Sequence, residues 1–319
     1  MPPAVDAALS PLPAVEAARR VGPRADDPLG GILLLLLAVL TFSCSDATAK
    51  YLSTELPVIE IIWLRYLVFA LVLVPSALRS GVGVLRSTRP GLQLLRGMGM
   101  LVSSLFFISC LPVLPLADAT AIGFVSPLFI TALSIPVLGE RVGMRRWAAI
   151  VVGLIGVVVV IRPGTSAFQP AALLPILSAL SWAGAIVITR KMSGTEGTLT
   201  TLIFSAVSAL LVVSFMVPFD WVMPTARQLG IALLYGIFAS GGQWLIVLAY
   251  HRAGASALAS LNYSQLVWAV ALGFLVFGAV PDRWTLAGAS IIIASGLYTA
   301  HRERLRTRTR PHPVRRDPT

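Results

Sequence analysis

The stretch LAVLTFSCSDATAKYLS (residues 37–53) decides the fold, because it completes an apolar run that begins at Gly30 yet carries Asp46 and Lys50. An apolar segment of this length crosses a hydrocarbon core of about 30 Å as a helix. Each charge at the centre of such a helix opposes insertion by about 2.5–3.5 kcal/mol. The two charges therefore need partners in the fold or a role in function.

The composition of the chain excludes a soluble globular protein. Of 319 residues, 56% are hydrophobic and 12% are charged, whereas soluble proteins carry about 25% charged residues. The mean hydropathy is +0.84. The net charge of +11 does not indicate a nucleic-acid partner, because the basic residues lie in short loops and in the C-terminal tail. The sequence therefore predicts a polytopic protein embedded in a lipid bilayer.

Ten apolar stretches are long enough to span the bilayer, and we expect an all-α integral membrane protein with ten transmembrane helices. Residues 1–29 are expected to form a flexible N-terminal arm, and residues 301–319 a basic cytoplasmic tail. The ten stretches lie at about residues 30–52, 57–78, 94–112, 117–138, 146–162, 170–190, 198–218, 228–249, 255–278 and 284–300.

The distribution of basic residues predicts the orientation. With the N-terminus placed in the cytoplasm, 20 of the 25 Lys and Arg residues fall on the cytoplasmic side and five on the other. Basic residues favour the cytoplasmic ends of spans. We therefore expect a multi-pass protein of the cell inner membrane with both termini in the cytoplasm.

The two halves of the chain resemble each other. Residues 177–193 align with residues 37–53 at a shift of 140, residues 233–245 with 94–106 at 139, and residues 255–266 with 117–128 at 138. This predicts two repeats, at residues 30–162 and 170–300. Five spans per repeat is an odd number, so the second repeat enters the membrane inverted. Inverted repeats typically enclose a substrate site near the midplane and work by alternating access. The alternative is that the duplication merely builds a stable bundle.

Four motifs carry a family resemblance: DATAKYL (46–52), EIIWLRYL (60–67), LPLADATAIGFVSPLFITALSIPVLGERV (114–142) and RRWAAIVVGLIGVVVVIRPG (145–164). Over residues 30–300 the chain resembles the drug/metabolite transporter superfamily, in its ten-helix EamA-domain branch. The first two motifs look most like members described as riboflavin or S-adenosylmethionine transporters, and other members export amino acids. The resemblance implies a cavity lined by helices 1, 3, 4, 6, 8 and 9, with helices 5 and 10 at the periphery.

Four charged residues are predicted at one depth of the first two helices. Asp46 and Lys50 lie one helical turn apart, and Glu60 and Arg65 on the next helix lie at a comparable level. Paired, they sum to zero charge, which offsets the cost of insertion. One interpretation is a structural ion-pair network. In the other, Asp46 faces the cavity and carries a coupling proton, or Arg65 binds an anionic group of the substrate.

A second charged pair is expected at the cytoplasmic level. Arg96 begins the third span and Glu140 ends the fourth, and the two form a candidate inner gate. The alternative is that both are loop-edge charges that set the topology. Small residues in helices 5 and 10 suit close helix contact within the chain and a dimer face equally, so the oligomeric state stays open. These residues are Gly153, Gly156, Gly288 and Gly296.

Polar and aromatic side chains gather where the matched segments of the two repeats are expected to meet. Such a ring suits a planar or amphipathic solute, whose edges the polar groups would bind. The alternative is polar contact between helices combined with aromatic packing. The candidate substrate-binding residues are Phe42, Asp46, Arg65, Ser103, Phe107, Ser126, Trp182, Gln243, Trp244, Asn262, Tyr263 and Gln265.

These observations predict a secondary transporter of a small organic metabolite. The chain contains no G-x-x-x-x-G-K-[ST] motif for ATP, so the energy would come from a solute gradient, a proton or exchange. No catalytic residue, cofactor or metal is expected, because the three histidines lie outside the spans and the two cysteines lie in apolar segments. The alternatives are a non-transporting membrane subunit or sensor and, with less support, an intramembrane enzyme.

Overall fold

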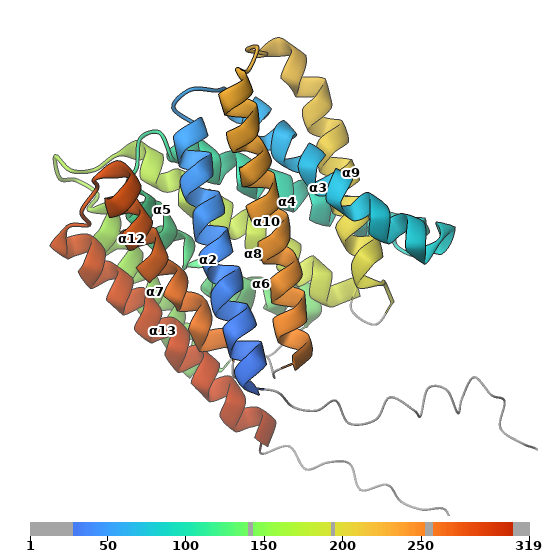
Figure 1. Ribbon diagram of the computed structural model, residues 1–319. Helices are drawn as coiled ribbons and strands as arrows, with labels where there is room; N and C mark the ends of the chain where they lie inside the picture. Colours follow the sequence, from blue (N-terminus) through green and yellow to red (C-terminus); the bar gives the residue numbers. More distant parts are fainter. Residues whose placement is uncertain (1–27, 140–142, 193–194, 253–257, 309–319) are drawn as a thin grey trace, which may run out of the picture.

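The computed structural model describes residues 28–139, 143–192, 195–252 and 258–308. All regular structure within these ranges is helical, and they contain no strand (Figure 1). A 3-10 turn, η4 (Ala259–Tyr263), precedes α12. The helices are α2 (Pro28–Leu52), α3 (Val58–Ser80), α4 (Pro90–Cys110), α5 (Leu116–Gly123), α6 (Ser126–Leu138), α7 (Met144–Ile161), α8 (Leu173–Met192), α9 (Thr198–Met216), α10 (Ala226–Arg252), α12 (Ser264–Phe277) and α13 (Arg283–Arg308).

Several helices have the length and composition of membrane spans. In the part of the chain that the structure describes, seven helical segments are long and apolar enough to cross a membrane. Two shorter apolar helices cover Trp147–Ile161 and Leu261–Phe277. The expected all-helical membrane class is therefore confirmed. The seven segments are Leu29–Leu52, Val58–Ser80, Pro90–Cys110, Leu116–Leu138, Pro170–Met192, Thr198–Phe219 and Ala226–Ile246.

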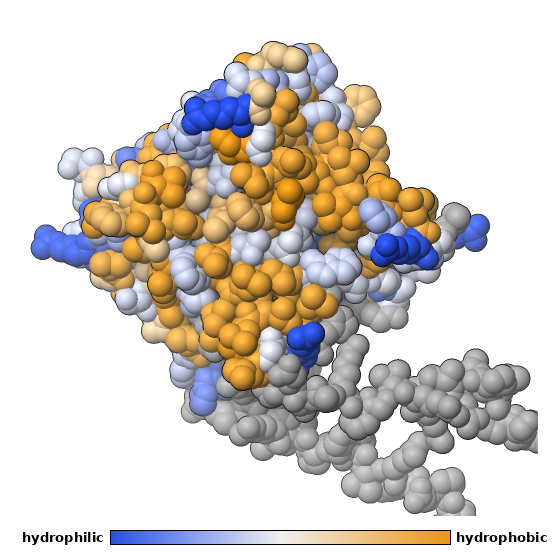
Figure 2. All heavy atoms as spheres, viewed as in Figure 1, coloured by the Kyte–Doolittle hydropathy of each residue, from blue (hydrophilic) through white to orange (hydrophobic). Residues whose placement is uncertain are grey.

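The outer surface of the helix bundle is apolar. Figure 2 shows that hydrophobic residues cover most of the visible face, with strongly hydrophilic residues in separate patches near its edges. Large apolar side chains point outward, among them Leu78, Phe215 and Leu275, which are 78%, 77% and 75% exposed. An apolar surface this extensive is favourable in lipid and unfavourable in water.

The helices pack in pairs that join the first half of the chain to the second. α2 lies along α10, α4 lies along α8, and α3 contacts both α9 and α10 (Figure 1). α7 and α13 lie side by side at one edge of the bundle, as expected for helices 5 and 10. Their backbones nearly touch: a Cβ atom added to Gly156 would lie 2.9 Å from the carbonyl oxygen of Gly288. These two glycines therefore serve a contact inside the chain.

Two of the expected continuous helices are interrupted. The span expected at residues 117–138 consists of α5 and α6, which are separated at Phe124 and Val125. Pro127 in the first turn of α6 lacks the N–H group that a continuous helix would need. In the second half, η4 gives way to α12 at Ser264. Ser126 and Ser264 are 138 residues apart, which equals the shift of the matched segments.

Candidate functional site

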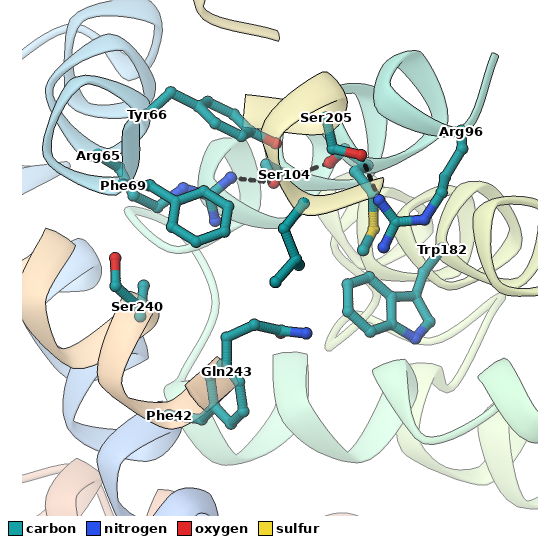
Figure 3. Close-up of a pocket in the computed structure, with 13 residues that line it drawn as sticks. Phe42, Arg65, Tyr66, Phe69, Arg96, Ser104, Trp182, Ser205, Ser240 and Gln243 are labelled. Atoms are coloured by element: carbon teal, nitrogen blue, oxygen red, sulfur yellow. Dashed lines mark hydrogen bonds between the residues drawn. The ribbon is translucent and has the colours of Figure 1, made fainter. Parts of the chain in front are cut away.

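A cavity lies between six helices, three from each half of the chain, and Figure 3 shows the side chains that line it. It is bounded by α2, α3 and α4 on one side of the sequence and by α8, α9 and α10 on the other. The lining residues are Phe42, Arg65, Tyr66, Phe69, Arg96, Met100, Ser104, Trp182, Leu202, Ser205, Ala239, Ser240 and Gln243.

Arg65 projects from α3 into this cavity. Its Nη2 donates a hydrogen bond of 2.6 Å to Oγ of Ser104 on α4. Its guanidinium carbon lies 4.5 Å from the ring centroid of Tyr66 and 5.8 Å from that of Tyr235. Stacking on an aromatic ring leaves the edge of a guanidinium group available for hydrogen bonds.

Arg96 projects from α4 into the same cavity, which the sequence did not predict. Its Nε donates to Oγ1 of Thr189 at 2.7 Å, and its Nη1 donates to the carbonyl oxygen of Thr201 and to the hydroxyl of Ser205. In Figure 3, Arg65 and Arg96 approach the cavity from different sides, with Ser205 next to Arg96. Glu140, the partner expected for Arg96, lies outside the described residues. The described partners of Arg96 belong to α8 and α9 instead.

Four of the candidate substrate-binding residues line the cavity together. They are Phe42, Arg65, Trp182 and Gln243. The next residue, Trp244, does not line it and is 53% exposed on the outer surface of α10. Successive residues on a helix point about 100° apart, so a helix that directs Gln243 inward directs Trp244 outward.

Two candidates on α4 take part in helix packing instead of lining the cavity. Ser103 lies 3.0 Å from Ser178 of α8, oxygen to oxygen, and its carbonyl oxygen accepts a second hydrogen bond of 2.8 Å from the Ser178 hydroxyl. Phe107 packs against the main hydrophobic core. Ser103 therefore holds α4 against α8, and neither residue lines the cavity.

Of the remaining candidates, all but Asp46, which lies within α2, lie at or next to the helix interruptions. Ser126 begins α6, and Asn262 and Tyr263 end η4. The ring of Tyr263 contacts that of Phe124, with 5.1 Å between centroids. Nearby on α12, Nε2 of Gln265 donates a 3.2 Å hydrogen bond to Oδ2 of Asp46 on α2.

The ion-pair network expected among Asp46, Lys50, Glu60 and Arg65 is absent from the described residues. Nζ of Lys50 donates to the carbonyl oxygens of Leu111 and Leu114 at 2.5 and 2.6 Å. These carbonyls follow the end of α4, where helix geometry leaves acceptors unsatisfied. Glu60 accepts a 3.2 Å hydrogen bond from a backbone N–H in the α9–α10 loop. Each of the four charges therefore takes a separate partner.

A carboxylate from the second half binds the start of α4, and we call this contact the α4 latch. Oε1 of Glu196, between α8 and α9, accepts hydrogen bonds from the Thr88 hydroxyl at 2.7 Å, the Thr88 N–H at 2.8 Å, the Ser87 hydroxyl at 2.9 Å and the Arg89 N–H at 2.9 Å. Oε2 accepts from Gln93 at 3.1 Å. The bonds from Thr88, Ser87, Gln93 and the Arg89 backbone lower the pKa of Glu196 to about 2. A carboxylate at a helix N-terminus is stabilised in this way.

A second contact, the α10 latch, joins the halves near the opposite end of α3. Oε2 of Glu55, after α2, accepts a 3.0 Å hydrogen bond from Gln228 in the first turn of α10. Arg227 donates to the hydroxyl of Tyr51. Glu55 and Glu196 are 141 residues apart, close to the shift between the repeats. Each latch thus places a carboxylate from one half at the start of a helix from the other.

Sequence reasoning missed several lining residues and both latches. The cavity is lined by α3 and α9, which are the second and seventh expected spans. The resemblance implied the fourth and ninth spans instead, which correspond to α5–α6 and α12. A usable signal was present, because Arg96, Met100 and Ser104 recur every four residues and so share one face of α4. Arg65 and Phe69 have the same spacing on α3. The latches depend on loops that are distant in sequence and leave no periodic pattern.

An apolar helical bundle around a polar-edged cavity is the architecture of a membrane transporter. Comparison with known families places the chain more narrowly. The model of the EamA-like transporter family matches residues 29–162 and again residues 169–299. The chain belongs to this family, which is part of the drug/metabolite transporter superfamily, and it is a multi-pass membrane transporter rather than an enzyme.

Curated relatives support this assignment over most of their length. The chain is 31% identical to the S-adenosylmethionine uptake transporter of Rickettsia prowazekii, over 86% of this chain and 94% of the relative. It is also 31% identical to the riboflavin transporter of Vibrio cholerae, over 88% of this chain and 96% of the relative. Its identity to the pseudopaline exporter CntI of Pseudomonas aeruginosa is 31%, over 83% of this chain and 94% of the relative. A solved structure titled "Crystal structure of protein" shares the fold, with a TM-score of 0.61 and 23% identity over 86% of this chain and 98% of that one.

Proposed function

We propose that the chain is a secondary active transporter that moves a small organic metabolite across the inner membrane by alternating access to the central cavity. The observation that carries this proposal is that both halves of the chain contribute helices to the cavity walls. Three lining helices come from the first matched segment, 29–162, and three from the second, 169–299. A relative movement of the two units would therefore open the cavity toward one compartment or the other.

The proposed architecture is ten spans in two inverted five-helix units, with α7, α12 and α13 completing the set of longer helices. The helix pairs support it. Exchanging the two units turns the α2–α10 pair into the α8–α4 pair, while α3–α9 and α7–α13 each map onto themselves. The interruptions before Ser126 and Ser264 fall at matched positions, and discontinuous helices are typical of inverted-repeat transporters. In this arrangement the basic loops place both termini in the cytoplasm.

We assign the two latches to the gates of the cavity. The α4 latch and the α10 latch lie near opposite ends of α3, and each connects one unit to the other. Alternating access requires that one connection opens while the other stays closed. Both contacts are formed in this structure, and in the proposed cycle each opens in turn while the other holds. Their nearly equivalent positions in the two repeats suit a symmetric cycle.

A proton gradient is the energy source that the side chains favour. Asp46 is a carboxylate inside a span, and its described hydrogen-bond partner is the neutral amide of Gln265 on the other unit. Ionisable residues within spans commonly mark proton paths. Protonation of Asp46 would change the contact between α2 and α12, and it would thereby couple a proton to movement of the units.

Uptake into proteoliposomes tests the proposal. The first solutes to assay are S-adenosylmethionine and riboflavin, since relatives are named for them. We expect accumulation of one of these solutes under a solute or proton gradient. Gln243→Ala should reduce it strongly, and Trp244→Ala on the outer face of the same helix should leave it near the wild-type level. Absence of uptake of small metabolites under every gradient would refute the proposal.

A further inference from the structure

The cavity contains two arginines and no acidic lining residue. Arg65 and Arg96 both line it, and none of the other lining residues is Asp or Glu. The hydrogen-bond acceptors of both guanidinium groups are neutral. They are Ser104, Tyr66 and Tyr235 for Arg65, and Thr189, Thr201 and Ser205 for Arg96. The site therefore has an excess of positive charge.

Asp46 does not remove this excess. It interacts electrostatically with Arg65, but its hydrogen bond goes to Gln265 and it does not line the cavity. It balances at most one of the two arginines. Arg96 is 5% exposed, and its described contacts include no carboxylate. A cation within a membrane protein is costly unless an opposite charge accompanies it.

Both arginines keep hydrogen-bond donors that a ligand could use. A guanidinium group has five N–H donors in a planar fork. Ser104, Tyr66 and Tyr235 take three donors of Arg65 and leave two. The acceptors around Arg96 use its Nε and Nη1 and leave Nη2. Arginine pairs well with carboxylate and phosphate because their oxygens match this fork.

The rest of the wall is suited to a flat ring. Phe42, Tyr66, Phe69 and Trp182 line the cavity beside the arginines, and Gln243 points inward among them (Figure 3). Aromatic side chains bind planar groups by stacking, and a single amide can fix the orientation of a ring edge. The cavity thus combines an anion-binding end with an aromatic wall.

We propose that the transported solute is a ring-bearing oxyanion, a planar aromatic or heteroaromatic compound whose carboxylate or phosphate binds between Arg65 and Arg96. This inference rests on the proposed function, because it names the substrate class of the same cavity. It assigns Arg96 to solute recognition instead of to a gate.

Matched probes that differ by the oxyanion test the inference on the purified full-length chain. S-adenosylmethionine against its decarboxylated analogue tests the carboxylate, and flavin mononucleotide against riboflavin tests the phosphate. Binding is followed by the ligand-induced shift of the melting temperature over a concentration series. We expect the acidic member of at least one pair to bind about tenfold or more tightly than its partner, a difference of about 1.4 kcal/mol.

Variants locate the effect. Arg65→Gln and Arg96→Gln should each abolish the preference for the acidic probe while leaving the affinity for its partner unchanged. Arg79→Gln, at the exposed end of α3 and outside the cavity, is the matched control and should keep the preference. If either Gln variant fails to fold, Arg65→Lys and Arg96→Lys retain the charge but lose the fork, and they should show a reduced preference.

The outcomes separate the two proposals. Equal affinity for both members of each pair, an unchanged preference in the arginine variants, or no binding of any probe would overturn the inference about the oxyanion. The transporter proposal would survive each of these results if proteoliposomes still accumulate a solute. Binding with a strong oxyanion preference but no uptake under any gradient would instead overturn the proposed transport cycle.

Discussion

Phe124 and Tyr263 meet at the two helix interruptions, with ring centroids 5.1 Å apart. Phe124 lies between α5 and α6, and Tyr263 ends η4 before α12. The contact therefore joins the matched interruptions of the two halves directly. It gives the proposed inverted units a shared aromatic contact around which they would move.

Removing this contact should weaken the junction between the halves. Tyr263→Ala removes an aromatic pair worth about 0.5–1.5 kcal/mol beyond its buried area, so we expect a lower melting temperature and slower uptake. Tyr263→Phe keeps the ring and serves as the control. Equal melting temperatures for the Ala and Phe variants would show that the contact contributes nothing.

The pH dependence of the α4 latch follows from the low pKa of Glu196. A carboxyl group whose pKa falls on folding, here from 4.5 to about 2, stabilises the folded state above pH 4.5, and this contribution is lost as the pH falls toward 2. We expect Glu196→Gln to lower the melting temperature by a constant amount between pH 5 and pH 8, because Glu196 stays ionised there. The difference from the wild type should shrink below about pH 4. A difference that changes between pH 6 and pH 8 would contradict this assignment.

We expect Lys50 to stabilise the fold and to take no part in solute binding. Lys50→Met leaves the carbonyl oxygens of Leu111 and Leu114 without the ammonium group that they bind. An unsatisfied buried polar group costs about 1–3 kcal/mol, so we expect a destabilised protein. Solute affinity, measured by titration below the melting temperature, should remain at the wild-type value. A variant with normal stability and lost affinity would place Lys50 in the binding site instead.

The close packing of α7 against α13 at the edge of the bundle depends on small residues. Gly156→Leu would force the side chain into the backbone of α13 at Gly288, and overpacking of this kind costs about 1–3 kcal/mol. The matched control is Gly230→Leu in α10, because a Cβ atom there meets nothing within 4 Å. We expect a lower melting temperature for the first variant and little change for the second. Equal effects would contradict the close packing of α7 on α13.

The sequence predicted the class of fold well, because hydropathy and the distribution of basic residues can be read directly along the chain. The apolar runs mark the helices, and the matched segments identify the duplication before any contact is known. Phe42 and Trp182, which the alignment of the halves pairs with each other, line one cavity. The proposed inverted arrangement accounts for this agreement, since matched positions of two inverted units would face the same interface.

Contacts between segments that are distant in sequence could not be predicted from the sequence. The sequence predicts partners for Asp46 and Lys50 among the charges of the first two helices, but the structure supplies Gln265 for one and the end of α4 for the other. Arg96 was paired with Glu140 because both lay at the predicted cytoplasmic level. Its described contacts on α8 and α9 depend on how the two halves pack, and no local pattern encodes that packing.

Disulfide closure of each latch tests whether the cavity opens to one compartment at a time. After replacement of the native Cys44 and Cys110 by serine, the pair Thr88→Cys with Glu196→Cys would lock the α4 latch. Glu55→Cys with Gln228→Cys would lock the α10 latch. In each background, Ser240→Cys in the cavity wall is exposed to a membrane-impermeant thiol reagent added from one side of the membrane at a time.

We expect that either lock stops uptake until the disulfide is reduced. With the α4 latch locked, Ser240→Cys should react only from the side of the α10 latch, and with the α10 latch locked only from the side of the α4 latch. Labelling from the same side in both locked proteins, or uptake that continues with a latch locked, would contradict a cavity that opens to one compartment at a time.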